Sequence, residues 1–203
     1  MLHGSSIVLP GLAVLLAALP ANAHHPMDGA IPSNLAEGFL SGLGHPVIGI
    51  DHLAFLLAAG LVAAVFRLGL WLPAVFVAAS IGGVALHVLG LDLPLAELVI
   101  GASVLGIGAA LATAWAMRST SVWAAGFAVA GLFHGHAYGE SIIGAEATPL
   151  VAYLAGLALV QTAIGVGAAV AASRARWTAE TLAPRLAGAA ACGVAVTVLA
   201  GMI

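Results

Sequence analysis

The near absence of charge is the strongest constraint on what this chain can fold into. Its 203 residues include five Arg, no Lys and eight Asp or Glu, so that 6% are charged and 63% are hydrophobic. Soluble domains carry about 25% charged residues, and a soluble globule could not cover its surface with so few. The high hydrophobicity also excludes a disordered chain. The composition therefore predicts an all-α, polytopic membrane protein, in which the 26 Gly are well tolerated.

The same counts exclude several function classes. Five Arg spread along the chain cannot neutralise a nucleic-acid backbone, so we expect no nucleic-acid partner. No GxxxxGK[ST] loop is present, so we expect no nucleotide partner either. Cys192 is the only cysteine, which excludes an intrachain disulfide and a multi-cysteine metal site. We expect no prosthetic group; the expected partner is the lipid bilayer, and a homo-oligomer is left open.

Residues 1–23 have the pattern of an export signal peptide. An apolar run at residues 7–19 is too short to span a bilayer comfortably, and small residues precede a cleavage site after Ala23. Cleavage there begins the mature chain at His24 and His25, where two imidazoles beside a free amine predict a weak metal chelate. A cut after Ala21, an uncleaved short first helix and solvated histidines without a metal are the alternatives.

Six apolar stretches follow, and residues 24–203 are expected to form one six-span domain. Each stretch is long enough to cross a bilayer, which takes about 17–25 residues. The expected spans are residues 46–66, 68–90, 94–117, 121–144, 148–172 and 183–203.

The Arg residues orient these spans. Six crossings place all of them on one side: Arg67, Arg118, Arg174, Arg176 and Arg185. Positively charged loops favour the cytoplasm, so both mature termini should lie outside, as an exported N-terminus requires. The two three-span halves would then have opposite topology, as in an inverted repeat, although sequence similarity between them is faint.

Ionisable residues inside apolar spans indicate a functional site, because burying them in hydrocarbon is costly. The first group lies in HPVIGIDH, residues 45–52, at the outer mouth of the first span. It contains His45, Asp51 and His52. On a regular helix the two histidines are roughly 10 Å apart. They would not share one ion unless the helix unwinds near Gly49, and two stations along one path fit this spacing better.

The second group lies in FHGHAYGE, residues 133–140, in the fourth span. His134 and His136 point about 200° apart on an ideal helix, on the two flanks of a stripe of glycines. His136 and Glu140 are four residues apart and can meet through space. The stripe, which admits close approach of another helix, consists of Gly131, Gly135 and Gly139.

Two further ionisable residues fall in the outer halves of their spans. His87 is a candidate ligand or a helix–helix hydrogen-bond partner. Glu97 is a candidate ligand or an interfacial carboxylate that favours the N-terminus of its helix. Imidazoles and carboxylates from four spans are thus expected at one level, on the side away from the Arg residues. Such nitrogen and oxygen ligands suit Ni²⁺, Co²⁺ or Zn²⁺ without distinguishing these ions.

Two motifs at these positions carry a resemblance to a known family. They are His45-Pro46-x-x-Gly49-x-Asp51-His52-Leu53 and Phe133-His134-Gly135-His136-Ala137-x-Gly139-x-Glu140. With the export signal and six spans, they resemble the HupE/UreJ family of hydrogenase- and urease-accessory membrane proteins, regarded as nickel and in some members cobalt permeases. Family members often carry a third His where this chain has Tyr138, and commonly a Met where it has Leu56.

The resemblance implies a permease of the bacterial inner membrane, not an enzyme, that supplies Ni²⁺ or Co²⁺ for hydrogenase or urease maturation. The implied ion contacts are His45, Asp51, His52, His134, His136 and Glu140, with His24, His25, His87 and Glu97 as weaker candidates. One alternative is an intramembrane metal-dependent hydrolase, although no HExxH helix or nucleophile elbow is present. The other is a metal sensor or chaperone-docking protein, for which the short loops offer little surface.

Overall fold

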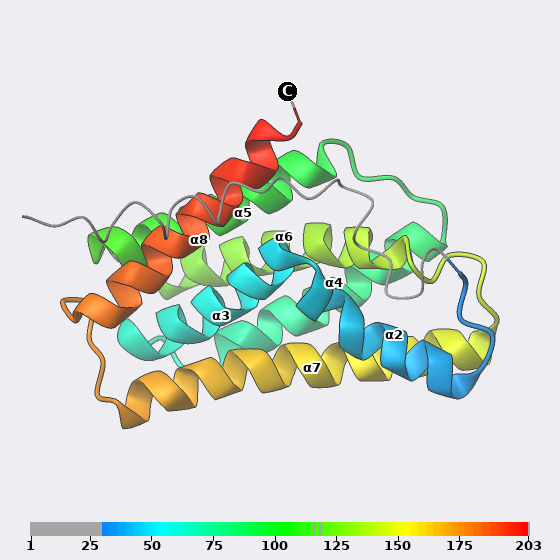
Figure 1. The fold of residues 1–203 in the computed structure, drawn as a ribbon, viewed down its shortest axis with the longest axis horizontal. Helices are drawn as coiled ribbons and strands as arrows, with labels where there is room; N and C mark the ends of the chain where they lie inside the picture. The colour runs from blue at the N-terminus through cyan, green and yellow to red at the C-terminus, as the bar shows by residue number, and fades with distance from the viewer. Residues whose placement is uncertain (1–29, 116, 118, 203) are drawn as a thin grey trace, which may run out of the picture.

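The computed structural model describes residues 30–115, 117 and 119–202. The predicted signal peptide, His24, His25 and Arg118 lie outside these residues. The described chain contains seven helices and no strand, which confirms the predicted all-α architecture (Figure 1). The helices are α2 (Leu35–Ile48), α3 (Ile50–Val65), α4 (Trp71–Val88), α5 (Ala96–Thr113), α6 (Thr120–Gly139), α7 (Ala147–Arg174) and α8 (Leu182–Ala200).

Four of these helices, α4, α5, α7 and α8, are each long and apolar enough to cross a membrane. The bent pair α2 and α3 meets the same criteria as one broken span, which raises the count to five. Helix α6 has 20 residues but is not in this set, because its two His and its Gly residues lower its mean hydropathy. The chain is thus a polytopic membrane protein, and the total of six spans stays a prediction.

The first predicted span is wrong as a single helix over residues 46–66. The helix breaks at Gly49, whose ψ of 102° is extended, and the two parts meet at an angle of 79°. Pro46 lies inside the last part of α2 and cannot donate a helical hydrogen bond, and Gly49 has a low helix propensity. Both residues disfavour a continuous helix here.

Helix α2 also begins earlier than expected, at Leu35. Asn34 caps it, because its Oδ1 accepts a hydrogen bond of 3.0 Å from the backbone N–H of Glu37. The Glu37 carboxylate in turn accepts from the backbone N–H of Ser33 at 2.8 Å. A capping residue followed three positions later by Glu is a helix-start signal that the hydropathy pattern alone does not reveal.

Glycines bring α2 against the first half of α7. A Cβ atom added at Gly42 would lie 2.1 Å from the carbonyl oxygen of Tyr153, and one at Gly156 would lie 2.3 Å from that of Phe39. The two helices therefore touch backbone to backbone. This packing places His45, near the end of α2, beside Tyr153 of α7.

The predicted glycine groove of α6 is confirmed, and its partner is α4. A Cβ atom at Gly135 would lie 2.0 Å from the carbonyl oxygen of Ser80, and one at Gly131 would lie 2.5 Å from that of Phe76. Because both neighbours are backbone atoms, no side chain fits between these helices. The close contact fixes the position of the histidines on α6 relative to α4.

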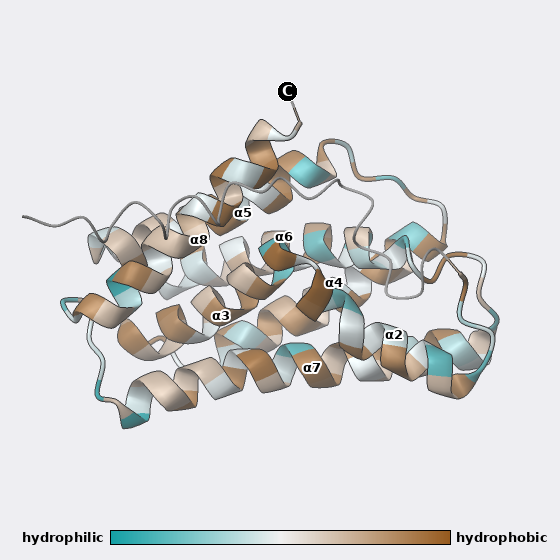
Figure 2. Cartoon of the chain, in the orientation of Figure 1, coloured by the Kyte–Doolittle hydropathy of each residue, from teal (hydrophilic) through white to brown (hydrophobic). Residues whose placement is uncertain are grey.

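Polar residues are buried in this bundle and large apolar residues face outward. On α7 and α8, the side chains of Val151, Leu159 and Leu186 are 67%, 55% and 59% exposed. Figure 2 shows apolar residues along the outer faces of these helices. The buried polar residues are Ser41, His45, Asp51, His52, Ser80, His134, His136, Ser141 and Gln161. This inverted distribution fits a surface that contacts lipid.

The described Arg residues mark one end of the bundle, called the arginine end below. Helices α3 and α7 end there and α8 begins there (Figure 1). Arg67 and Arg174 line one pocket at this end. Arg185 Nε donates a hydrogen bond of 3.0 Å to the carbonyl oxygen of Ala112, near the end of α5.

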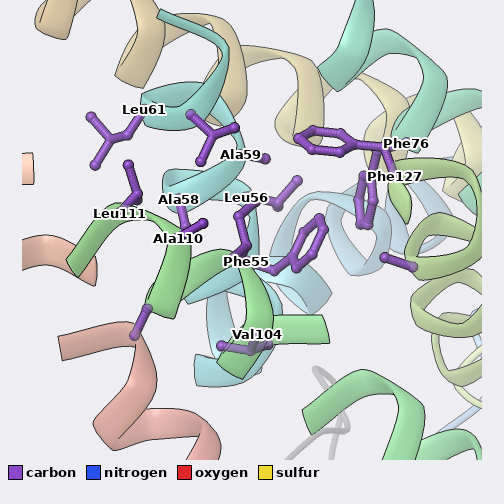
Figure 3. Close-up of a cluster of buried hydrophobic side chains, with 14 of the residues drawn as sticks. Phe55, Leu56, Ala58, Ala59, Leu61, Phe76, Val104, Ala110, Leu111 and Phe127 are labelled. Carbon is purple, nitrogen blue, oxygen red and sulfur yellow. The ribbon is translucent and has the colours of Figure 1, made fainter. Parts of the chain in front are cut away.

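An apolar core lies between the arginine end and the buried histidines. Phe55 of α3 stacks on Phe76 of α4, with ring centroids 4.7 Å apart, and meets Phe127 of α6 at 6.0 Å (Figure 3). Phe55 also contacts the ring of His134 at 4.8 Å. Phe55 and Phe76 therefore pack directly against the His134 ring.

Candidate functional site

The two predicted motifs meet through His52 of α3 and His134 of α6. Their Nδ1 atoms are 2.8 Å apart, and the two residues are 3% and 0% exposed. They are separated by 82 positions in the sequence. Burying two imidazoles in an apolar bundle costs free energy unless each ring nitrogen has a hydrogen-bond partner.

Hydrogen bonding defines the tautomer of each ring. Ser103 Oγ donates to the carbonyl oxygen of Ile100 at 2.7 Å, so its single proton is used there. His134 Nε2, at 3.0 Å from the same hydroxyl oxygen, must therefore donate to it. A neutral His134 then has a lone pair at Nδ1 and accepts a hydrogen bond from His52 Nδ1–H. One proton lies between the two rings.

Asp51 supplies a buried negative charge beside this pair. Its carboxylate Oδ1 lies 4.0 Å from His52 Nδ1 and accepts a hydrogen bond of 2.8 Å from the backbone N–H of His52. Asp51 is 3% exposed and lies in the first turn of α3, where the helix dipole stabilises an anion. The carboxylate can therefore balance a positive charge placed at the imidazoles.

The bend at Gly49 brings His45 into the same group. The ring centroids of His45 and His52 are 5.9 Å apart, instead of the roughly 10 Å expected on a regular helix. Tyr138 lies against both rings, with centroid distances of 5.2 Å to His45 and 4.5 Å to His52. Its buried hydroxyl has no hydrogen-bond partner among the described residues.

Two hydroxyl groups contact His45 Nδ1. Ser141 Oγ is one hydrogen-bond partner, and Tyr153 Oη of α7 lies 3.2 Å away. Tyr153 also donates a hydrogen bond of 2.7 Å to the carbonyl oxygen of Tyr138. Helix α7 thus links the end of α2 to the end of α6 and holds the His45 ring in place.

His136 belongs to a second, separate group with His87. Their Nδ1 atoms are 3.4 Å apart and their ring centroids 4.4 Å apart. His136 Nε2 lies 3.2 Å from both the carbonyl oxygen of Leu91 and the backbone nitrogen of Leu93. As expected from their angular separation on α6, His134 and His136 serve different neighbours. His87, the weaker candidate, is therefore a close partner of a motif histidine.

The two glutamates are exposed at the ends of their helices. Glu140 is the C-cap residue of α6, and among the described residues no hydrogen bond or ion pair joins it to His136, its expected partner. It instead interacts electrostatically with His87, the partner of His136. Glu97 is exposed in the first turn of α5, the position that an interfacial carboxylate favours.

Sequence reasoning did not single out Ser103, Ser141 or Tyr153. Ser103 and Tyr153 are isolated polar residues in apolar stretches, and this signal could have identified them as candidates. Their partners could not have been inferred, because each contacts a histidine on another helix.

The described residues present pairs of potential metal ligands. No group of three or more His, Cys, Asp or Glu side chains in this part of the chain has an arrangement that could hold a metal ion. The close imidazole pairs are His52 with His134 and His87 with His136.

Comparison with known proteins identifies the family. The chain matches the family described as HupE / UreJ protein over residues 12–199. This chain belongs to the HupE/UreJ family. It is 33% identical over 156 residues to Protein HupE of Rhizobium leguminosarum bv. viciae, covering 75% of this chain and 78% of that protein. No solved structure matches the chain.

Family membership confirms the resemblance inferred from the two motifs. The HupE/UreJ match includes both motifs and all seven described helices except the last residue of α8. The paired histidines His52 and His134 come one from each motif. The two motifs of this HupE/UreJ protein thus meet at one buried pair of histidines, while His136 of the second motif pairs with His87.

Proposed function

We propose that this HupE/UreJ protein is a transition-metal permease of the bacterial inner membrane, with Ni²⁺, or Co²⁺, as its cargo. The ion enters from the periplasmic side, contacts the buried imidazoles and leaves into the cytoplasm, where it supplies hydrogenase or urease maturation. The membrane potential contributes about 2.3 kcal/mol per elementary charge per 100 mV to inward movement of a cation.

The observation that carries this proposal is the buried contact between His52 and His134. Two nitrogen ligands at right angles on a metal, with bonds of about 2.0 Å, lie about 2.8 Å apart. The two Nδ1 atoms have this spacing of 2.8 Å. Square-planar nitrogen coordination is typical of Ni²⁺ and Cu²⁺. The two rings are therefore close enough to bind one ion together, and 2.8 Å is at the same time an ordinary hydrogen-bond distance.

Ion binding at this edge requires the proton between the rings to leave. Metal ligands must be deprotonated, so binding an ion at these imidazoles releases or relocates a proton. Asp51, at 4.0 Å from His52 Nδ1, offsets part of the charge of the ion. The proposed site therefore exchanges a proton for a metal ion beside a fixed carboxylate.

Replacing one histidine of either imidazole pair tests the proposal. His52→Ala leaves His134 without its partner, and we expect radioactive nickel uptake to fall to the level of cells without the protein. His136→Ala is expected to abolish uptake as well, because it removes the paired histidine of the second group. Uptake is measured in a strain that lacks other nickel importers, with membrane abundance determined by immunoblotting.

A matched control separates ion contact from folding. Thr197 on α8 makes a hydrogen bond within its own helix, to the carbonyl oxygen of Gly193 at 3.0 Å. Thr197→Val should therefore transport like the unchanged protein. If His52→Ala and His136→Ala are as abundant as the control and take up as much nickel, these histidines do not contact the ion. If the unchanged protein takes up no nickel, the permease assignment is wrong.

Competition identifies the cargo. Unlabelled Co²⁺ added in excess should reduce nickel uptake if both ions use the imidazole pair. Nickel uptake that is unaffected by excess Co²⁺ would restrict the cargo to Ni²⁺.

A further inference from the structure

A pocket at the arginine end is separate from both histidine pairs. It has a volume of about 390 Å³ and lies between the last turns of α3 and α7, beside the residues that precede α4. Small-ligand sites in proteins typically have volumes of about 300–1,000 Å³. The polar part of its lining is Arg67, Ser173 and Arg174, and the apolar part includes Leu70 and Val170. The pocket is therefore large enough for a small ligand and has a cationic and an apolar wall.

The positive charges of this pocket are not neutralised within the described part of the chain. No described Asp or Glu lines the pocket, and the side chains of Arg67 and Arg174 form no ion pair or hydrogen bond among the described residues. Both side chains are exposed. A guanidinium presents five N–H donors in a planar fork, which matches the oxygens of a phosphate group. The pocket therefore offers two cationic donors to an anion.

Arg67 has a backbone conformation that favours glycine. Its φ is 56°, and its backbone N–H and that of the next residue donate hydrogen bonds to the carbonyl oxygens of Ala64 and Ala63. This is the Schellman ending of a helix, in which glycine is the usual left-handed residue because it has no Cβ atom. Arg176 ends α7 in the same way, also with a φ of 56°. The two arginines thus match in backbone, charge and end of the bundle, and they differ in that Arg176 does not line the pocket.

The pocket lies where the apolar helices end. Trp71, the first residue of α4, is 48% exposed, and tryptophan at the end of a spanning helix is typical of the level of the lipid headgroups. Leu70 and Val170 are 48% and 38% exposed, so part of the apolar wall faces the surroundings of the bundle. A small free anion would contact only the cationic wall. The combination of both walls fits a lipid with a charged headgroup.

We propose that this pocket binds the headgroup of an anionic phospholipid from the leaflet at the arginine end. Arg67 and Arg174 contact the phosphate group, and Leu70 and Val170 contact the start of an acyl chain. Basic pockets between spanning helices are recognised sites for anionic headgroups. This inference goes beyond the permease proposal and does not depend on it, because neither the histidines nor the metal ion is involved.

Lipid titration of the purified full chain in detergent tests this inference. Phosphatidylglycerol should bind, measured by native mass spectrometry, and should raise the melting temperature more than phosphatidylcholine with the same acyl chains. Arg67→Gly removes a charged hydrogen-bond donor, so its Kd for phosphatidylglycerol should be about tenfold higher. The melting temperature of this variant without lipid should not fall, since glycine is favoured at this position. Arg174→Gln should weaken binding as well.

Arg176→Gly is the matched control, and it should bind phosphatidylglycerol like the unchanged protein. Equal weakening in Arg67→Gly and Arg176→Gly would mean that the lipid responds to the total charge of this end, and the inference would be overturned. Unchanged binding in Arg67→Gly, or equally tight binding of phosphatidylcholine, would overturn it as well. Inorganic phosphate that displaces phosphatidylglycerol at equal concentration would show that the pocket holds a free anion, which also contradicts the inference. Nickel uptake is not measured, so failure of the permease proposal leaves these outcomes unaffected.

Discussion

Ser103 and Tyr153 show how single hydroxyl groups set the chemistry of buried imidazoles. Ser103 Oγ accepts a hydrogen bond of 3.0 Å from His134 Nε2–H, which leaves the lone pair of His134 at Nδ1, toward His52. Tyr153 lies 3.2 Å from His45 Nδ1 and is itself fixed to the backbone of α6. A hydrogen bond at one ring nitrogen therefore determines that the other nitrogen carries the lone pair for the proposed ion, although the hydroxyl group itself does not contact the ion.

Replacing Ser103 tests this orientation. Ser103→Ala removes the acceptor for His134 Nε2–H, so the ring is no longer held in one tautomer. Loss of such an outer partner typically lowers metal affinity or activity by about 10–100-fold. We expect the KM for nickel uptake to rise within this range at unchanged protein abundance.

Helix α5 offers a matched control for that substitution. Thr113 is an exposed residue whose hydroxyl bonds to the carbonyl oxygen of Ala109 in the same helix. Thr113→Val should leave the KM unchanged. A KM for Ser103→Ala within twofold of this control would contradict the orienting role of Ser103.

At the scale of elements, glycine contacts between helices position the histidines. The Gly135 backbone meets that of Ser80, so α4 and α6 approach more closely than side chains would allow. The Gly42 backbone meets that of Tyr153 in the same way, between α2 and α7. These contacts set the positions of His134 on α6 and of His45 on α2 relative to the neighbouring helices.

Adding one methyl group to the α4–α6 contact should destabilise the protein. In Gly135→Ala the new Cβ atom would lie 2.0 Å from a backbone oxygen, so the helices must separate. Overpacking of this kind typically costs about 1–3 kcal/mol. We expect a lower melting temperature for the purified protein in detergent, together with reduced nickel uptake.

Gly126 provides the matched comparison on the same helix. A Cβ atom at Gly126 meets nothing within 4 Å, and the residue is exposed. Gly126→Ala should be neutral or stabilise the helix by up to about 1 kcal/mol. Equal melting temperatures for the two variants would show that the close contact is not needed.

At the scale of the whole molecule, polarity is divided along the bundle. Arg67, Arg174 and Arg185 lie at the arginine end, while His87 and His136 lie toward the opposite end of α4 and α6. Phe55 stacks on Phe76 (Figure 3), and both of these rings also contact the His134 ring. The arginines and the His87–His136 pair therefore lie toward opposite ends of the bundle.

Reporter fusions test the orientation of the bundle. Positively charged loops favour the cytoplasm, so a green fluorescent protein joined after Arg176 should fluoresce. Helix α8 begins at the arginine end and leads away from it, so alkaline phosphatase joined after the last residue should be active in the periplasm. The opposite pattern of the two signals would mean that the arginine end faces the periplasm, which contradicts the proposed orientation.

Local signals in the sequence determined the helical class and most helix positions. The span expected at residues 148–172 became α7 (Ala147–Arg174), and that at residues 183–203 became α8 (Leu182–Ala200). Apolar length and charged turns are properties of neighbouring residues, so they are readable without a fold. The two motifs also pointed to the family and to His52 and His134 for the same reason.

Only the tertiary structure decided which of these residues meet. The break at Gly49 places the rings of His45 and His52 5.9 Å apart, and helix packing places His52 against His134 while it leaves Glu140 exposed. Ser103 and Tyr153 acquire their roles from contacts with histidines on other helices. Such contacts depend on how closely two helix backbones approach. This distance is set by residues of both helices, which are far apart in the sequence. The scarcity of charge determined that this protein belongs in a membrane, and the packing of its helices determined where its few ionisable groups gather.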